Sequence, residues 1–234
     1  MVERLSPGDV IGRAFGIYRD QIGVLLPAAL IVFAIDAIVT WIFDEGALTL
    51  IAAVVSLVLA TLYQGMVVQL VRDVQDGRRD NTMGELFSSV TPVLGPLILV
   101  SILAGIGIGI GFILLIVPGL IFLTYAAASA PVMKLEHRGV SDSIRRSIGL
   151  VRGRARKVFL IVVGTILVTE AAVQLIAIPF NGAALLAGVN LVGEAIFQPF
   201  EGLVVALVAI HLLELHGEAP APDAMARALV AEHD

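Results

Sequence analysis

Six acidic and amide side chains lie inside stretches of sequence that are otherwise apolar and long enough to cross a membrane. They are Asp36, Glu170, Gln174, Glu194, Gln198 and Glu201. On a helix the three side chains of the last stretch share one stripe, and Glu170 and Gln174 share another at i, i+4. No lysine or arginine falls within these stretches to neutralise the carboxylates. The spacing therefore predicts an intramembrane polar cluster.

A charged side chain deep in a bilayer costs about 2.5–3.5 kcal/mol on insertion scales, so this cluster should face the interior of a helix bundle or water. In one interpretation the carboxyl groups are protonated and hydrogen-bonded to neighbouring polar side chains, which is the commoner arrangement. In the other they line a polar cavity open to the outer side, and such a cavity suits a proton, a metal cation or a cationic headgroup. A dry cluster indicates a structural role, and a wet one indicates transport or ligand binding.

The densest basic cluster of the chain lies between residues 134 and 157. Its members are Lys134, Arg138, Arg145, Arg146, Arg152, Arg154, Arg156 and Lys157. One interpretation is a determinant of membrane topology that also contacts anionic phospholipid headgroups, at about 1 kcal/mol per residue near the surface. The other is a dedicated site for a lipid phosphate or a protein partner. Nucleic acid is not an expected partner, because the cluster lacks interleaved aromatic side chains.

Catalytic, metal and cofactor chemistry find little support in the chain. It contains no cysteine, and its Ser and Thr residues show no His/Asp arrangement typical of nucleophilic catalysis. His211 and Glu214, at i, i+3, would need a second segment to complete a metal site. Glycines at alternate positions from Gly105 to Gly111 contain two G-x-x-x-G spacings, which predict close helix packing rather than a nucleotide-binding loop. We therefore expect no catalytic residues, no metal and no cofactor.

The elements that position these residues are membrane spans. Of 234 residues 58% are hydrophobic and 15% are charged, against about 25% charged in soluble domains. At about 20 apolar residues per crossing, the chain accommodates about six spans. We expect them at residues 23–43, 47–71, 92–117, 120–133, 158–179 and 190–213. The predicted fold class is all-α, a polytopic bundle of six transmembrane helices.

Short breaks and surface helices are expected to separate the spans. Pro118-Gly119 is predicted to break the chain into a hairpin between the third and fourth spans. Residues 120–133 are only just long enough to cross, so a re-entrant hairpin stays an alternative. Amphipathic helices are expected on the cytoplasmic side from Ser6-Pro7 onward, at 82–90 and at 141–151. The first should lie on the bilayer, with a cytoplasmic extension of the first span as the alternative.

We expect one membrane domain over residues 1–217 and a flexible cytoplasmic tail over 218–234. The pattern that runs from Asp9 to Arg19 recurs from Asp142 to Arg152, each time before a span. Together with the helix at 82–90, this echo predicts three units, each made of a surface helix and a hairpin.

The basic residues predict the orientation of the chain. Of the 15 lysines and arginines, three precede the first span, three lie between the second and third, eight lie between the fourth and fifth, and one is in the tail. The other three loops contain none, so the positive-inside rule places both termini in the cytoplasm. The amino terminus lacks a cleavage site after a short apolar core, so the first span should be an uncleaved anchor. The predicted location is the cytoplasmic (inner) membrane, with multiple crossings.

Three passages together resemble a known family. They are residues 71–79 (VRDVQDGRR), 115–120 (LIVPGL) and 130–153 (APVMKLEHRGVSDSIRRSIGLVRG). They are similar to the six-span bacterial proteins grouped as the glycerophosphoryl diester phosphodiesterase membrane domain, over most of residues 5–213. The resemblance implies a bacterial integral membrane protein of unsettled biochemical role. The family label comes from proteins that join this domain to a phosphodiesterase barrel, and this chain has no barrel, so the hydrolase activity is not implied.

The leading functional expectation is a non-enzymatic membrane scaffold or accessory domain that contacts anionic lipid. A membrane-protein partner or a second copy of the chain would complete the assembly. The alternative is a small transporter or ligand-handling protein with an acidic intramembrane cavity. A second alternative is a membrane-embedded lipid enzyme, although no general base, nucleophile and oxyanion donor can be assembled from identifiable motifs.

Overall fold

The computed structural model describes residues 6–43, 46–78 and 82–216, and this part of the chain is helical with short turns and no strand. Its α-helices are α1 (Pro7–Ile42), α2 (Thr49–Gln75), α3 (Met83–Val90), α4 (Leu94–Leu114), α5 (Ile116–Ala126), α6 (Ser129–Glu136), α7 (Val140–Val151), α8 (Ala155–Ala177) and α9 (Ala183–Leu215). Six segments are long and apolar enough to cross a membrane. The all-α, six-span prediction is confirmed. The predicted tail at 218–234 lies outside the described residues.

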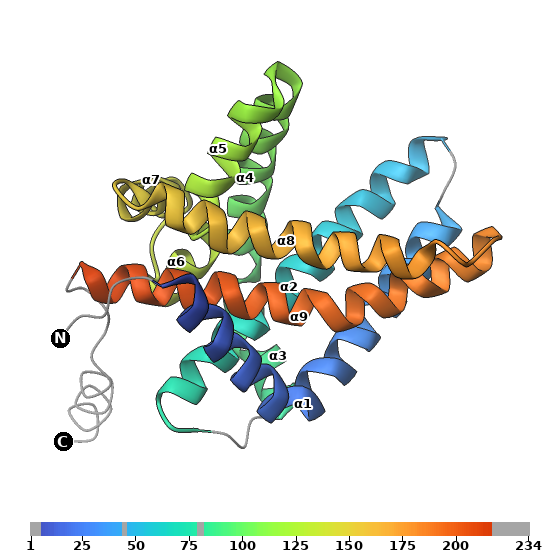
Figure 1. Cartoon of the computed structure of the whole chain (residues 1–234), viewed down its shortest axis with the longest axis horizontal. Coiled ribbons are helices and arrows are strands. Elements are labelled where there is room, and N and C mark those ends of the chain that lie inside the picture. The colour runs from blue at the N-terminus through green and yellow to red at the C-terminus, as the bar shows by residue number, and fades with distance from the viewer. Residues whose placement is uncertain (1–5, 44–45, 79–81, 217–234) are drawn as a thin grey trace.

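Three helical hairpins diverge from a common packed end of the molecule (Figure 1). The α1–α2 and α8–α9 turns lie toward the right of the view and the α4–α5 turn lies at the top, whereas α6, α7 and the end of α9 gather on the left. Side chains at the packed end, such as Val67, Leu150 and Leu212, are fully buried. At the α4–α5 turn, by contrast, Ile113 is 85% exposed. The outer parts of the hairpins therefore present apolar side chains to lipid.

Helix α9 is the element against which the bundle packs. It contacts α1 more extensively than any other helix, and it also packs on α2 and α8. Its second half, from Leu203 to Leu213, is almost entirely buried, while residues 190 to 198 of its first half are mostly exposed. Pro199 lies inside the helix between these halves and cannot donate the backbone hydrogen bond expected there.

The first amphipathic segment forms the beginning of α1 and not a separate surface helix. Helix α1 is continuous from Pro7 to Ile42, and its ribbon changes direction along its length, with Pro27 inside the helix (Figure 1). The apolar face around Val10 and Ala14 is buried in the protein core, and Tyr18 packs edge-on against Phe200 of α9 at 6.3 Å between ring centroids. The expectation that this face lies on the bilayer is wrong, because α9 covers it. The alternative of an extension of the first span is the observed arrangement.

The other two short helices form where predicted. Helix α3 begins with a capping box, in which Thr82 Oγ1 accepts from the backbone N–H of Glu85 at 3.3 Å and the Glu85 carboxylate accepts from the N–H of Thr82 at 3.0 Å. Helix α7 follows a left-handed turn at His137 and buries Ser147 and Leu150 on the packed end of the bundle. These helices join the hairpins at their packed ends.

The hairpin between α4 and α5 turns three residues earlier than predicted. The extended residue is Leu115, whereas Pro118 and Gly119 lie inside the first turn of α5. A proline is tolerated there because the first turn of a helix has no internal partners for its N–H groups. The residues are therefore a helix start and not the break itself.

The predicted outer loop at 180–189 is also shorter in the structure. The turn occupies residues 178–182, where Gly182 has a φ of +106° that favours glycine, and α9 begins at Ala183. The sequence AALLAGV contains good helix formers, which extend α9 into the region predicted to be a loop.

One of the two G-x-x-x-G pairs in α4 makes the close packing that the spacing predicts. A Cβ added at Gly111 would lie 2.8 Å from the Cα of Gly119, and one added at Gly107 would lie 2.3 Å from the Phe122 ring. Gly105 and Gly109, by contrast, have nothing within 4 Å. Only the face of α4 that carries Gly107 and Gly111 thus meets α5.

This asymmetry predicts different outcomes for two conservative substitutions. Gly111→Ala should destabilise the folded protein by about 1–3 kcal/mol, because the added methyl group meets the α5 backbone, which cannot move without opening the hairpin. Gly109→Ala, on the other face of the same helix, should instead stabilise the protein by about 0.5–1 kcal/mol, because the added methyl group meets nothing and alanine has the higher helix propensity. Unfolding by SDS titration in mixed micelles measures both free energies. Equal effects of the two substitutions would contradict the packing described.

Candidate functional site

The predicted polar stripes of α8 and α9 face each other across a pocket of about 210 Å³. Its polar lining consists mainly of three carboxylates and three amides. These are Glu170, Gln174, Asn190, Glu194, Gln198 and Glu201. None of the described residues that line the pocket is a lysine or an arginine. The structure thus brings five of the six predicted residues into one pocket.

The pocket opens on the surface of the protein. The side chains of Glu170, Gln174, Glu194 and Gln198 are exposed, and Glu201 is half-buried. The Thr169 hydroxyl donates a hydrogen bond to the Glu201 carboxylate. Since most of the stripe is not enclosed by neighbouring helices, the placement fits the interpretation of an accessible polar cavity better than that of interior polar packing.

Asp36, the sixth predicted residue, stands beside the pocket. Its carboxylate lies on α1 and interacts electrostatically with Glu194, as does that of Glu170 on α8. Asp36 Oδ1 is buried and has no hydrogen-bond partner among the described residues. Three helices therefore contribute negative charge to one region.

A second pocket of about 230 Å³ adjoins the first deeper in the bundle. It lies among α1, α2, α8 and α9, and its lining includes Tyr63, Gln64 and Thr165. Gln198 and Glu201 line both pockets, so their side chains stand at the boundary between them. The Tyr63 hydroxyl is already engaged, donating to the carbonyl of Leu25 at 3.2 Å.

Five residues that line the acidic pocket were not predicted from the sequence: Thr169, Val173, Asn190, Gly193 and Phe197. Asn190 is one helical turn before Glu194 on the same stripe, and this i, i+4 spacing could have identified it if the residue had not been assigned to a loop boundary. Thr169 could not be told from other span threonines without its contact to Glu201. Phe197 lines the pocket, but nothing in an apolar span marks one phenylalanine as a site residue.

The carboxylates of the acidic pocket are spread along it and not gathered at one point. Among the described residues, no group of three or more histidine or acidic side chains is placed to hold a metal. The carboxylates are instead distributed along a pocket with amides between them. Such a lining attracts positive charge and accepts hydrogen bonds from it.

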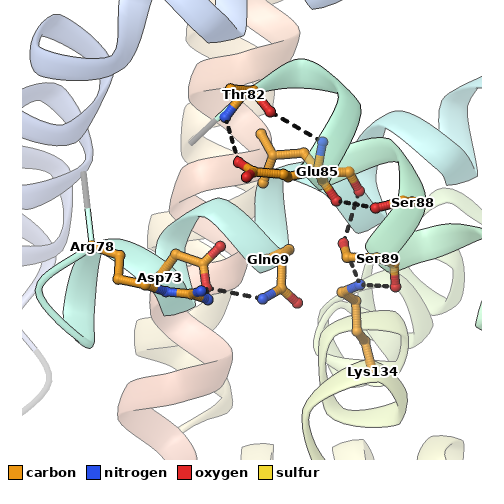
Figure 2. Close-up of polar contacts among 9 residues, drawn as sticks. Gln69, Asp73, Arg78, Thr82, Glu85, Ser88, Ser89 and Lys134 are labelled. Carbon is orange, nitrogen blue, oxygen red and sulfur yellow. Dashed lines mark hydrogen bonds and ion pairs between the residues drawn. The ribbon is translucent and has the colours of Figure 1, made fainter. Parts of the chain in front are cut away.

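The basic cluster at the packed end divides into buried and exposed members. Lys134 is buried, and its Nζ donates to the backbone carbonyl of Ser89 at 3.2 Å, as Figure 2 shows. That carbonyl belongs to the last turn of α3, where a positive charge is favourable. Lys134 also interacts electrostatically with the buried Asp73. The Lys134 ammonium group therefore interacts with groups inside the protein, and it is not available to lipid headgroups.

Asp73 is itself surrounded by donors. Gln69 Nε2 donates to its carboxylate at 3.0 Å, and Arg78 forms an ion pair with the same oxygen (Figure 2). On the neighbouring segment, Arg138 Nε donates to Glu136, and Arg146 Nε lies 3.5 Å from the same carboxylate. These interactions join α2, α3, α6 and α7 at the packed end.

The remaining predicted headgroup contacts point outward. The side chains of Arg145, Arg152, Arg156 and Lys157 are exposed, and Arg154 is half-buried. Arg138 is exposed as well, although its Nε is bonded to Glu136. The structure thus leaves a basic surface around α7 and the start of α8.

Residues of the family-like motif have identifiable structural roles. Ser147 donates to the carbonyl of Tyr125 at 2.7 Å, and Leu150 and Val151 are fully buried. Gly153 has a φ of +86°, which favours glycine, in the turn between α7 and α8. The motif therefore fixes α7 against the end of α5.

Comparisons of the chain with family models, with curated proteins and with solved structures give no match. The resemblance to the glycerophosphoryl diester phosphodiesterase membrane domain stays a prediction. Function is argued below from the geometry of the two sites.

The buried position of Lys134 predicts that it matters more for stability than its exposed neighbours. Lys134→Met should destabilise the protein by about 1–3 kcal/mol, because the Ser89 carbonyl loses its donor and Asp73 loses a nearby positive charge. Lys157→Met removes the same charge from an exposed site and should cost less than about 0.5 kcal/mol. The SDS titration described above measures both. A Lys134 variant as stable as the Lys157 variant would show that the Lys134 ammonium group does not stabilise the packing of α6 against α2 and α3.

Proposed function

We propose that this protein is a ligand-handling membrane protein that binds an organic cation in the pocket between α8 and α9. One observation carries the proposal. Two membrane-spanning helices expose three carboxylates and three amides in a single pocket, without a basic residue among those that line it. This is the alternative with an acidic cavity rather than the leading scaffold expectation.

Carboxylates inside a span must meet water, hydrogen-bond donors or positive charge, because hydrocarbon offers none of these. The Thr169 hydroxyl meets this requirement for Glu201 only. For Glu170 and Glu194, the donors at hand are the amides of the pocket, water or a bound cation, and a bound ammonium group would also relieve the repulsion among the carboxylates.

We also propose how the helix bundle is oriented in the membrane. Exposed basic side chains gather at the packed end, whereas the pocket lies nearer the turns of the hairpins. By the positive-inside rule the packed end is cytoplasmic, which makes the pocket accessible from the outer side of a bacterial inner membrane. A cationic ligand would then enter from outside.

A second function is supported by the basic surface. Arg145, Arg152, Arg156 and Lys157 project from α7 and the start of α8, next to the headgroup region of the inner leaflet in this orientation. We propose that they bind anionic phospholipid, which would hold the packed end on the membrane in the manner of a scaffold. The two functions use different ends of the helix bundle and do not compete. Neither requires enzymatic activity.

The first proposal predicts that the acidic stripe is wet. The chain contains no cysteine, so single cysteines can be introduced at positions 170 and 194 and labelled in intact cells with a membrane-impermeant thiol reagent. Both should react from outside. Val168→Cys is the matched control, because Val168 is 70% exposed on the same helix at nearly the same depth but outside the pocket lining. It should not react, since lipid excludes the reagent. If positions 170 and 194 react no faster than 168, the pocket is not open to water and the proposal fails.

The second proposal predicts a loss of bound anionic lipid. Replacing Arg145, Arg152, Arg156 and Lys157 together with glutamine should weaken that binding by about 1 kcal/mol for each charge removed. The measurement is the ratio of anionic to zwitterionic lipid that copurifies in mild detergent. Glutamine at Arg13 and Arg19, on α1, serves as the control for general loss of positive charge. Equal losses in both variants would contradict a specific role for the surface around α7.

A further inference from the structure

The inner pocket, the one of about 230 Å³ among α1, α2, α8 and α9, has a lining unlike that of the acidic pocket. Of the residues that line it, only Gln198 and Glu201 also line the acidic pocket. The rest of its lining is mostly apolar and includes two aromatic rings. The inner pocket therefore combines one carboxylate with aromatic and aliphatic side chains, whereas the acidic pocket is lined mainly by carboxylates and amides.

Two aromatic side chains, Phe33 on α1 and Tyr63 on α2, line the inner pocket side by side. Both are buried, their ring centroids are 5.5 Å apart, and their ring planes are inclined at 60° to each other. The Tyr63 hydroxyl donates to the carbonyl of Leu25 at 3.2 Å, which holds its ring in place. The two rings are therefore positioned by the fold itself, before any ligand binds.

Glu201 supplies the carboxylate of the inner pocket. None of the described residues that line this pocket is a lysine or an arginine. The Thr169 hydroxyl donates one hydrogen bond to the Glu201 carboxylate, which can accept about four. A positive charge beside this carboxylate is favourable, because the attraction between opposite charges is strong where water is scarce.

We propose that the inner pocket is a second cation site, which binds a methylated ammonium group against the Phe33 and Tyr63 rings with the Glu201 carboxylate as its counter-charge. Aromatic rings attract the diffuse charge of a quaternary ammonium group. Its methyl groups match an apolar lining and need no hydrogen bond, whereas a primary ammonium group must find an acceptor for each N–H. The inference goes beyond the proposed function, because it needs no ligand in the acidic pocket.

The size of the inner pocket fits one such group. Its volume of about 230 Å³ compares with about 150 Å³ for an engineered cavity that binds benzene, and a tetramethylammonium ion is about as large as benzene. A bare divalent metal ion is a poor match, because it needs about six oxygen ligands and the lining is mostly apolar. The ligand class is therefore a small amine whose nitrogen carries methyl groups.

Equilibrium dialysis with radiolabelled tetramethylammonium tests this proposal. The purified full chain is kept in a maltoside detergent, which contains no ammonium group. Two unlabelled competitors separate charge from shape, since methylammonium has the charge with a single methyl group and tert-butanol has a similar size without the charge. We expect saturable binding that neither competitor displaces at about a tenfold excess, because the rings and the apolar lining select for methyl groups and Glu201 selects for charge.

Substitutions distinguish the inner pocket from the acidic pocket. Phe33→Leu should weaken the binding of tetramethylammonium about tenfold, because leucine keeps the wall apolar but offers no ring. Glu170→Gln combined with Glu194→Gln removes two carboxylates of the acidic pocket and should change the dissociation constant less than about threefold. Tyr63→Phe keeps the aromatic ring without its hydroxyl and should have an equally small effect.

A fluorinated ring covers the case in which Phe33→Leu misfolds. Incorporation of 3,5-difluorophenylalanine at position 33 keeps the shape of the ring and withdraws electron density from its face, so binding should weaken severalfold while the packing is preserved.

Three outcomes would overturn the inner site. Full affinity in both Phe33 variants, together with loss of binding in the combined Glu170 and Glu194 variant, would place the cation in the acidic pocket, and the proposed function would stand. Displacement by methylammonium as effective as that by unlabelled tetramethylammonium would show that the methyl groups are not recognised. Absence of saturable binding would leave the inner pocket without a ligand of this class, and the cysteine labelling at positions 170 and 194 would decide the proposed function separately.

Discussion

Carboxylates inside a membrane span must not face hydrocarbon, and this constraint shapes the whole structure. Helix α9 meets it by dividing into two halves. Its second half, from Leu203 to Leu213, is buried against α1, α2 and α8. Its first half carries Glu194 and Gln198 on an exposed face. Glu201, at the boundary, is bonded to Thr169 and lines the pockets on both sides. The acidic pocket lies where the packed part of α9 ends.

The hairpins diverge because their outer parts are solvated by lipid and not by water. Between helices in lipid there is little hydrophobic driving force, since hydrocarbon chains solvate apolar side chains as well as a neighbouring helix does. Close contact then needs small residues or polar bonds. The packed end has both, with Gly65 against Val90 and Lys134 bonded to Ser89. Among the described residues, the outer parts of the hairpins have fewer such contacts. They are Gly107, Gly111 and Gly119 within one hairpin, and Gly193 and the Thr169–Glu201 hydrogen bond within another.

The sequence predicts the fold well where the evidence is a pattern within one segment of the chain. Long apolar runs identified the six spans, and amphipathic patterns identified α3 and α7. The same pattern misled at the start of α1, because periodicity shows that a face is apolar but not whether lipid or α9 covers it. Pro118 was misread for a related reason. A proline at the start of a helix and a proline in a turn look alike without the backbone.

The sequence predicted most of the polar residues of the candidate site, but it did not predict whether they face the bundle interior or its surface. Helical spacing grouped Glu194, Gln198 and Glu201, yet it could not show whether the stripe faced the bundle or its surface. Lys134 illustrates the opposite case. It stood in a basic cluster that suggested headgroup contact, and only the folding of α6 against α3 reveals that the ammonium group is buried. Contacts between segments far apart in the chain carry this information.

The layer beneath Glu201 argues for a binding site rather than an open path across the membrane. The second pocket lies directly beneath Glu201, and beyond it Val67 is fully buried and Leu207 is nearly so. A Cβ on Gly202 would lie 3.1 Å from Val67, so α2 and α9 are in close contact at this point. An ammonium group would pay the full cost of desolvation to enter this layer. Passage to the packed end would therefore require α2 and α9 to separate, whereas binding in the acidic pocket requires no change in the bundle.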